Sequence, residues 1–125
     1  MAVSGDGVYT VTRTESGGAN TGQWNTILLV EGVSGKKVHI LRILVSCISS
    51  GYGHPGFVLS SQNDFSQADC TYFCPQQAGA YTVSVGPFTG LGPGFSLFDT
   101  LVSDGLNISL FNGGTYGISV TYVQS

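Results

Sequence analysis

Most of this sequence consists of short runs of alternating apolar residues, each bounded by Gly, Ser, Asn or Pro. Tyr81, Val83 and Val85, for example, alternate with Thr82 and Ser84. This alternation is typical of half-buried β-strands, because successive side chains of a strand point to opposite faces. No run keeps apolar residues at helical spacing for more than about one turn, so we predict no long helix.

Eight or nine short strands are predicted, at roughly 8–12-residue spacing. They cover residues 8–12, 24–30, 37–48, 57–61, 70–74, 81–85, 95–98, 106–111 and 115–123. This cadence predicts an all-β, antiparallel β-sandwich that is jelly-roll-like. The turn signal at Asn112-Gly113-Gly114 predicts that the last two strands form a hairpin.

The chain has 125 residues, which favours one domain. Residues 23–125 form the predicted β-sandwich domain. Residues 1–22 are predicted to be an N-terminal arm with the first strand, because Gly, Ser and Asn dominate residues 16–22. An arm of this kind can reach a neighbouring subunit.

Charged side chains are sparse, with four Lys or Arg, seven Asp or Glu and a net charge of −3. Binding to a phosphate backbone needs clustered cations, so we expect no nucleic-acid partner. Polar residues interrupt the longest apolar-rich stretch, 38–48, and the N-terminus lacks a basic segment followed by an apolar one. We therefore expect neither a membrane span nor a secretion signal, and synthesis in a cytoplasm.

The longest predicted strand, 37–48, is apolar on both faces if its residues alternate strictly. One face would carry Val38, Ile40, Arg42, Leu44, Ser46 and Ile48, and the other His39, Leu41, Ile43, Val45 and Cys47. A strand with two apolar faces lies either in the centre of stacked layers or against another chain. This pattern indicates burial in an oligomer.

The three cysteines do not form a closed disulfide framework. Cys70 and Cys74 would lie about 13 Å apart in an extended strand, too far for a disulfide, unless a turn brings them together or Cys47 pairs with one of them. We favour buried thiols that pack as small apolar groups. A disulfide among the three, or a metal site that adds His54, remains an alternative.

No motif that sets up a reaction is present. His39 is predicted to be a packed or interface histidine, and His54 a solvated turn residue. Asp64 and Asp69 flank one loop, and turn chemistry accounts for them better than a catalytic carboxylate pair. We therefore expect no enzymatic activity, no cofactor and no metal.

From Val33 to Val123 the chain resembles small virion proteins of tailed phages. The segments that carry the resemblance are Gly35-Lys36-Lys37-Val38-His39-Ile40, which looks like the strand that opens their core, then Gly105-Leu106-Asn107-Ile108-Ser109-Leu110, and Gly117-Ile118-Ser119-Val120-Thr121-Tyr122-Val123. Residues 1–32 and the three cysteines depart from the pattern.

The resemblance implies a head-decoration, or cement, protein that binds the outer face of the shell of major capsid protein and stabilises it. Such a protein would be made in the host cytoplasm, would lie on the capsid surface of the virion, and would form a homo-oligomer, with a trimer favoured. The predicted contacts with the capsid or with other subunits are Val8, Tyr9, Val11, Trp24, His39, Leu41, Ile43, Phe88 and Leu91.

Three rival functions stay open. A tail-fibre or receptor-binding head domain and a carbohydrate-binding module would both use exposed aromatic rings, for which the candidates are Tyr52, Phe57, Phe65, Tyr72, Phe73 and Tyr81. A small hydrolase would depend on a carboxylate such as Asp64 or Asp69.

Overall fold

The computed structural model describes residues 7–18, 24–49, 55–73, 79–88, 94–111 and 114–125, without the side chains of 49 and 66–73. Nine strands lie in these residues, and no helix does. They are β1 (Val8–Ser16), β2 (Trp24–Val30), β3 (Val38–Ser49), β4 (Gly56–Ser61), β5 (Asp64–Phe73), β6 (Gly79–Val85), β7 (Phe98–Asp99), β8 (Leu106–Phe111) and β9 (Gly114–Gln124). The expectation of an all-β chain with eight or nine short strands is confirmed.

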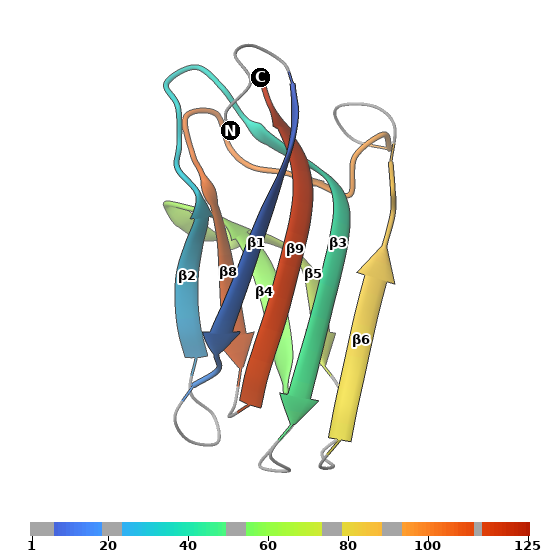
Figure 1. Ribbon diagram of the computed structural model, residues 1–125. Helices are drawn as coiled ribbons and strands as arrows, with labels where there is room; N and C mark the ends of the chain where they lie inside the picture. Colours follow the sequence, from blue (N-terminus) through green and yellow to red (C-terminus); the bar gives the residue numbers. More distant parts are fainter. Residues whose placement is uncertain (1–6, 19–23, 50–54, 74–78, 89–93, 112–113) are drawn as a thin grey trace.

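The strands form two antiparallel sheets that pack face to face (Figure 1). Sheet A has the order β1-β9-β3-β6, with the short β7 also paired to β3, and sheet B has the order β2-β8-β4-β5. The predicted antiparallel β-sandwich is therefore confirmed. Strand β1 pairs with β9 along its whole length, so the first strand of the segment 1–22 belongs to the sandwich. Residues 1–6 and 19–23 of the predicted arm lie outside the described residues.

The predicted hairpin between the last two strands is wrong. Strand β8 pairs with β2 and β4 in sheet B, whereas β9 pairs with β1 and β3 in sheet A. The apolar residues of the two strands meet across the core instead of side by side. Alternation marks which residues of a strand face the core, but it does not distinguish a hydrogen-bonded neighbour from a strand in the facing sheet.

The core lies between the two sheets. It contains Ile27, Leu29, Val30, Val38, Ile40, Ile43, Val45, Cys47, Phe57, Leu59, Phe98, Leu106, Ile108, Leu110, Tyr116, Ile118 and Val120. Tyr116 of β9 reaches across this core, where its hydroxyl donates to the carbonyl of Phe111 at 2.7 Å and accepts from the amide of Gly56 at 3.2 Å. Tyr116 therefore ties sheet A to sheet B with its polar group satisfied.

A β-bulge corrects the interpretation of the long strand β3. The register between β3 and β9 shifts between Ile40 and Arg42, so Leu41 is an extra residue. Val38 and Ile40 precede the bulge, and Ile43, Val45 and Cys47 follow it, yet all five are buried in the same core. Strict alternation assigned the residues before and after Leu41 to two opposite faces. Because the bulge reverses the alternation, the buried residues on both sides of it belong to one face of the sheet. The pattern is explained within one chain and does not indicate burial in an oligomer.

Candidate functional site

Exposed apolar side chains gather on two loops at one end of the sandwich. The loop between β2 and β3 carries Val33, and the loop between β7 and β8 carries Leu101 and Val102, whose exposed fraction is 57%. Both loops lie at the upper end of Figure 1. We call these three residues the loop end. Exposed apolar side chains grouped in this way are typical of surfaces that bind a partner.

The carboxylate of Asp104 fixes the second of these loops. Its Oδ2 accepts from the hydroxyl of Ser61 at 2.5 Å and from the amide of Asn63 at 3.1 Å, and its Oδ1 accepts from Nδ2 of Asn63 at 2.8 Å. Donation by Ser61 lowers the pKa of Asp104, burial opposes this effect, and donation by Asn63 lowers it further. The loop is therefore anchored to the turn after β4.

Hydrogen bonds also join the two loops to each other. The amide of Ser103 donates to the carbonyl of Lys36 at 2.7 Å, and the Ser103 hydroxyl accepts from the amide of Gly35 at 2.9 Å. Oε1 of Gln62 accepts from the amides of both Gly32 and Gly105. Because these hydrogen bonds join the two loops, they hold the backbone that carries the loop end in one conformation.

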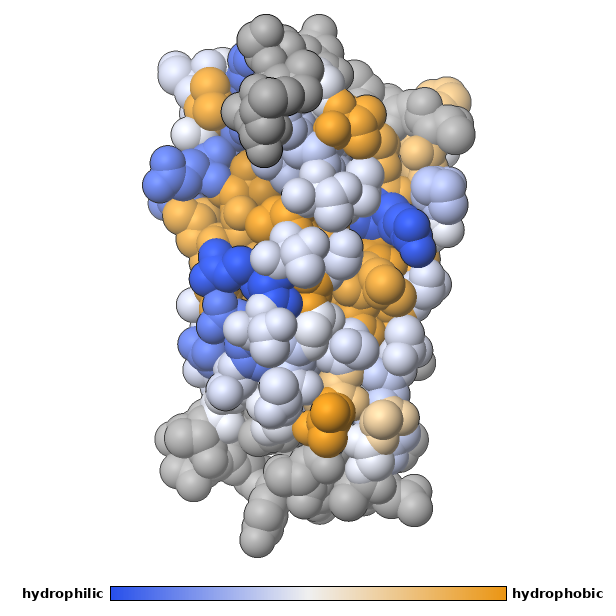
Figure 2. All heavy atoms as spheres, in the orientation of Figure 1, coloured by the Kyte–Doolittle hydropathy of each residue, from blue (hydrophilic) through white to orange (hydrophobic). Residues whose placement is uncertain are grey.

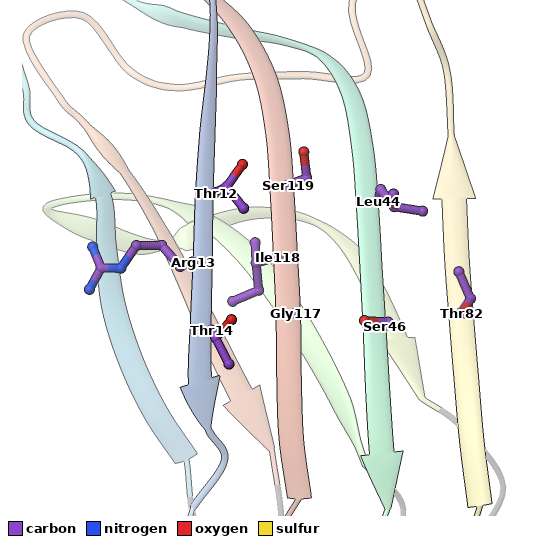
Figure 3. A pocket seen from close by; sticks show the side chains of 9 residues that line it. All are labelled: Thr12, Arg13, Thr14, Leu44, Ser46, Thr82, Gly117, Ile118 and Ser119. Carbon is purple, nitrogen blue, oxygen red and sulfur yellow. The ribbon is translucent and has the colours of Figure 1, made fainter. Parts of the chain in front are cut away.

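A groove crosses the outer face of sheet A (Figure 3). Its volume is about 330 Å³, and its lining is Thr12, Arg13, Thr14, Leu44, Ser46, Thr82, Gly117, Ile118 and Ser119. Gly117 helps to keep the groove open, because it has no side chain. A Cβ built at this position would lie 2.8 Å from the hydroxyl of Ser46. Figure 2 shows pale side chains of intermediate hydropathy running down the middle of this face.

Five of the nine lining residues of the groove are Ser or Thr, but most of the lining surface is apolar, because it also includes Leu44, Ile118 and the methyl groups of the threonines. Among the described lining residues Arg13 alone is charged, but its guanidinium extends away from the groove in Figure 3 and pairs with Glu15 at 2.7 Å. Among the described residues that line the groove there is no carboxylate or imidazole, and their few hydroxyl groups can hydrogen-bond to a neutral ligand.

Three aromatic rings form a cluster beside sheet B. The ring of Trp24 lies 4.4 Å from that of Phe111 and 6.4 Å from that of Phe65, centroid to centroid. Trp24 is 42% exposed and Phe65 is 53% exposed. Trp24 begins β2, Phe65 is the second residue of β5 and Phe111 ends β8, so all three rings come from strands of sheet B. We call these three residues the aromatic cluster.

A buried histidine, a buried serine and a half-buried aspartate lie together at the pairing of β3 with β7. Nδ1 of His39 is 2.9 Å from Oδ1 of Asp99, and the hydroxyl of Ser96 donates to the same oxygen at 2.5 Å. In a serine triad the histidine must lie between the hydroxyl and the carboxylate. Here both groups bind the carboxylate, which is a packing arrangement and agrees with the prediction of a packed His39.

The residues predicted as contacts are spread over several parts of the sandwich. Val8 is exposed on β1, Trp24 belongs to the aromatic cluster, and Ile43 has no exposed surface. His39 and Leu41 are also buried. These last three residues have almost no surface for another chain, and local packing accounts for them.

The other predicted contacts are partly buried or lie outside the described residues. Tyr9 stacks on Tyr122 with ring centroids 5.6 Å apart, and Val11 packs against the core. Burial, helped by the neighbouring Tyr9, raises the pKa of Tyr122. Phe88 is half-buried and donates its amide to the carbonyl of Leu41, and Leu91 lies outside the described residues.

The predicted cysteine and aromatic sites are only partly described. Cys47 is buried in the core, whereas the side chain of Cys70, and Cys74 and His54 as a whole, lie outside the described residues, so a disulfide or a metal site stays a prediction. Among the candidate sugar-binding aromatics, Phe57 is in the core and Tyr81 is half-buried. Tyr52 and the side chains of Tyr72 and Phe73 are not described.

Sequence reasoning missed the loop end, because Val33, Leu101 and Val102 fall in turn regions where isolated apolar residues give no periodic signal. Within the described segments no three His, Cys, Asp or Glu side chains are grouped to hold a metal ion. The same segments contain no helix of the length and apolarity that a membrane crossing requires. The chain matches no protein-family model and no curated protein.

Proposed function

We propose that this protein is a virion structural protein, a decoration or cement protein that binds the outer face of a shell of major capsid protein and stabilises it. The observation that carries the proposal is the loop end. There the apolar side chains of Val33, Leu101 and Val102 are exposed on loops that hydrogen bonds hold together. A rigid apolar surface loses little conformational entropy on docking, so more of its contact free energy remains for binding.

Sparse charge and repetition support the same proposal. The outer face of sheet A is mostly neutral, so it can approach another protein without burying unpaired charges. In a symmetric shell each weak contact is repeated, and linked contacts raise the total affinity without any strong single site. On this proposal the protein acts at the capsid surface without catalysis, as a homo-oligomer for which we favour a trimer.

We further propose that the sandwich is a jelly roll. Successive strands alternate between the two sheets from β1 to β4, and β4 and β5 form a hairpin within sheet B. Strands β8 and β9 again lie in opposite sheets. Eight strands wound in this way, with the two-residue β7 as an addition, support the jelly-roll description.

The test of the capsid proposal is co-sedimentation with purified shells of the major capsid protein that lack their decoration. The wild-type chain should sediment with the shells, and Val102→Asp should reduce the bound fraction at least tenfold, since a charge would be buried at the contact. Ile48→Asp is the matched control, because Ile48 is also apolar and is 66% exposed. It lies near the last residue of β3, at the end of that strand away from the loop end. Equal binding by the two variants would exclude the loop end as the contact.

A second candidate function is carbohydrate binding at the aromatic cluster. Partly exposed indole and phenyl rings can stack on the apolar face of a pyranose, and Trp24 is the one tryptophan of the chain. Titration with neutral oligosaccharides, followed by tryptophan fluorescence, tests this function. A saturable change that Phe65→Ala abolishes would favour it over capsid binding, and no change at millimolar sugar would reject it.

A further inference from the structure

We draw no further inference here: the strongest candidate, the groove across the outer face of sheet A, whose lining runs from Thr14 of β1 to Thr82 of β6, belongs to a sheet face for which nothing in the structure shows what covers it.

Discussion

The hydroxyl of Ser61, the last residue of β4, donates a hydrogen bond of 2.5 Å to Oδ2 of Asp104, in the loop before β8. Both residues are buried. The bond links the turn after β4 to the loop that carries Leu101 and Val102, and the amide of Leu101 donates to the same Ser61 hydroxyl at 3.0 Å. The stability of this contact therefore governs how firmly the loop end is held.

Asp104→Ala is expected to lower the free energy of unfolding by about 1–3 kcal/mol, because the donors on Ser61 and Asn63 lose a buried, charged acceptor. The change is measured by urea unfolding at pH 7. Glu31→Ala is the control, since Glu31 is an exposed acidic residue at the start of the β2–β3 loop and accepts a hydrogen bond from Gln124 through its backbone carbonyl, which the substitution keeps. An equal loss in both variants would contradict the anchoring role of Asp104.

The same carboxylate predicts a dependence of stability on pH. The pKa of Asp104 is lowered from its ordinary value of 3.8 by donation from Ser61, so the unfolded chain takes up this proton at a higher pH than the folded chain does. Its contribution is complete above pH 3.8 and is lost as the pH falls from there through the lowered pKa. Stability curves of wild type and Asp104→Ala should therefore converge in acid. Parallel curves would show that this group does not titrate as described.

Substitution by alanine should change the stability differently at Gly105, just before β8, and at Gly117, inside β9. A Cβ at Gly105 would lie 1.9 Å from the carbonyl oxygen of Val30, a backbone atom that cannot move freely, so Gly105→Ala should cost about 3 kcal/mol or more. At Gly117 the contact is the hydroxyl of Ser46, which can rotate away. Gly117→Ala should therefore be neutral or stabilising by about 0.5 kcal/mol, since glycine is unfavourable inside a strand. Thermal unfolding of both variants measures the two changes, and a lower melting temperature for Gly117→Ala than for Gly105→Ala would contradict the prediction.

Deletion of Leu41 should prevent stable folding. Without the bulge, the residues on one side of it must turn to the opposite face, and the side chains of Ile43 and Val45, or those of Val38 and Ile40, would leave the core. Each apolar side chain moved to water costs roughly 1.5–3 kcal/mol. Leu41→Met is the control and should cost less than about 1.5 kcal/mol, because it conserves volume. A deletion variant with a wild-type melting temperature would contradict the assigned register.

Phe65→Ala should shift the fluorescence emission of Trp24 to longer wavelength, because the variant exposes more of the indole to water. The stability should change by less than about 1 kcal/mol, since the phenyl ring is largely exposed. Phe95→Ala serves as the control, because Phe95 is also an exposed phenylalanine but lies in the loop between β6 and β7. An unchanged emission in Phe65→Ala would place the two rings apart.

The sequence by itself determined the fold class, the number of strands and most strand positions. Alternation is a local property, and a strand such as 81–85 shows it whatever its neighbours are. The alternation is hardest to recognise where apolar residues and turn residues are mixed. There the strand predicted at 95–98 is a two-residue strand, Phe98–Asp99, in the structure.

Only the tertiary structure decided which strands are paired and where the surfaces lie. The pairing of β8 with β2 and β4 and the bulge at Leu41 both depend on contacts between residues far apart in the chain. The loop end is of the same kind, because Val33 and Val102 are brought to one end by hydrogen bonds between loops. Local alternation records which side chains avoid water, but the sheet partner is set by packing of the whole sandwich, and a single residue inserted in one strand reverses its faces.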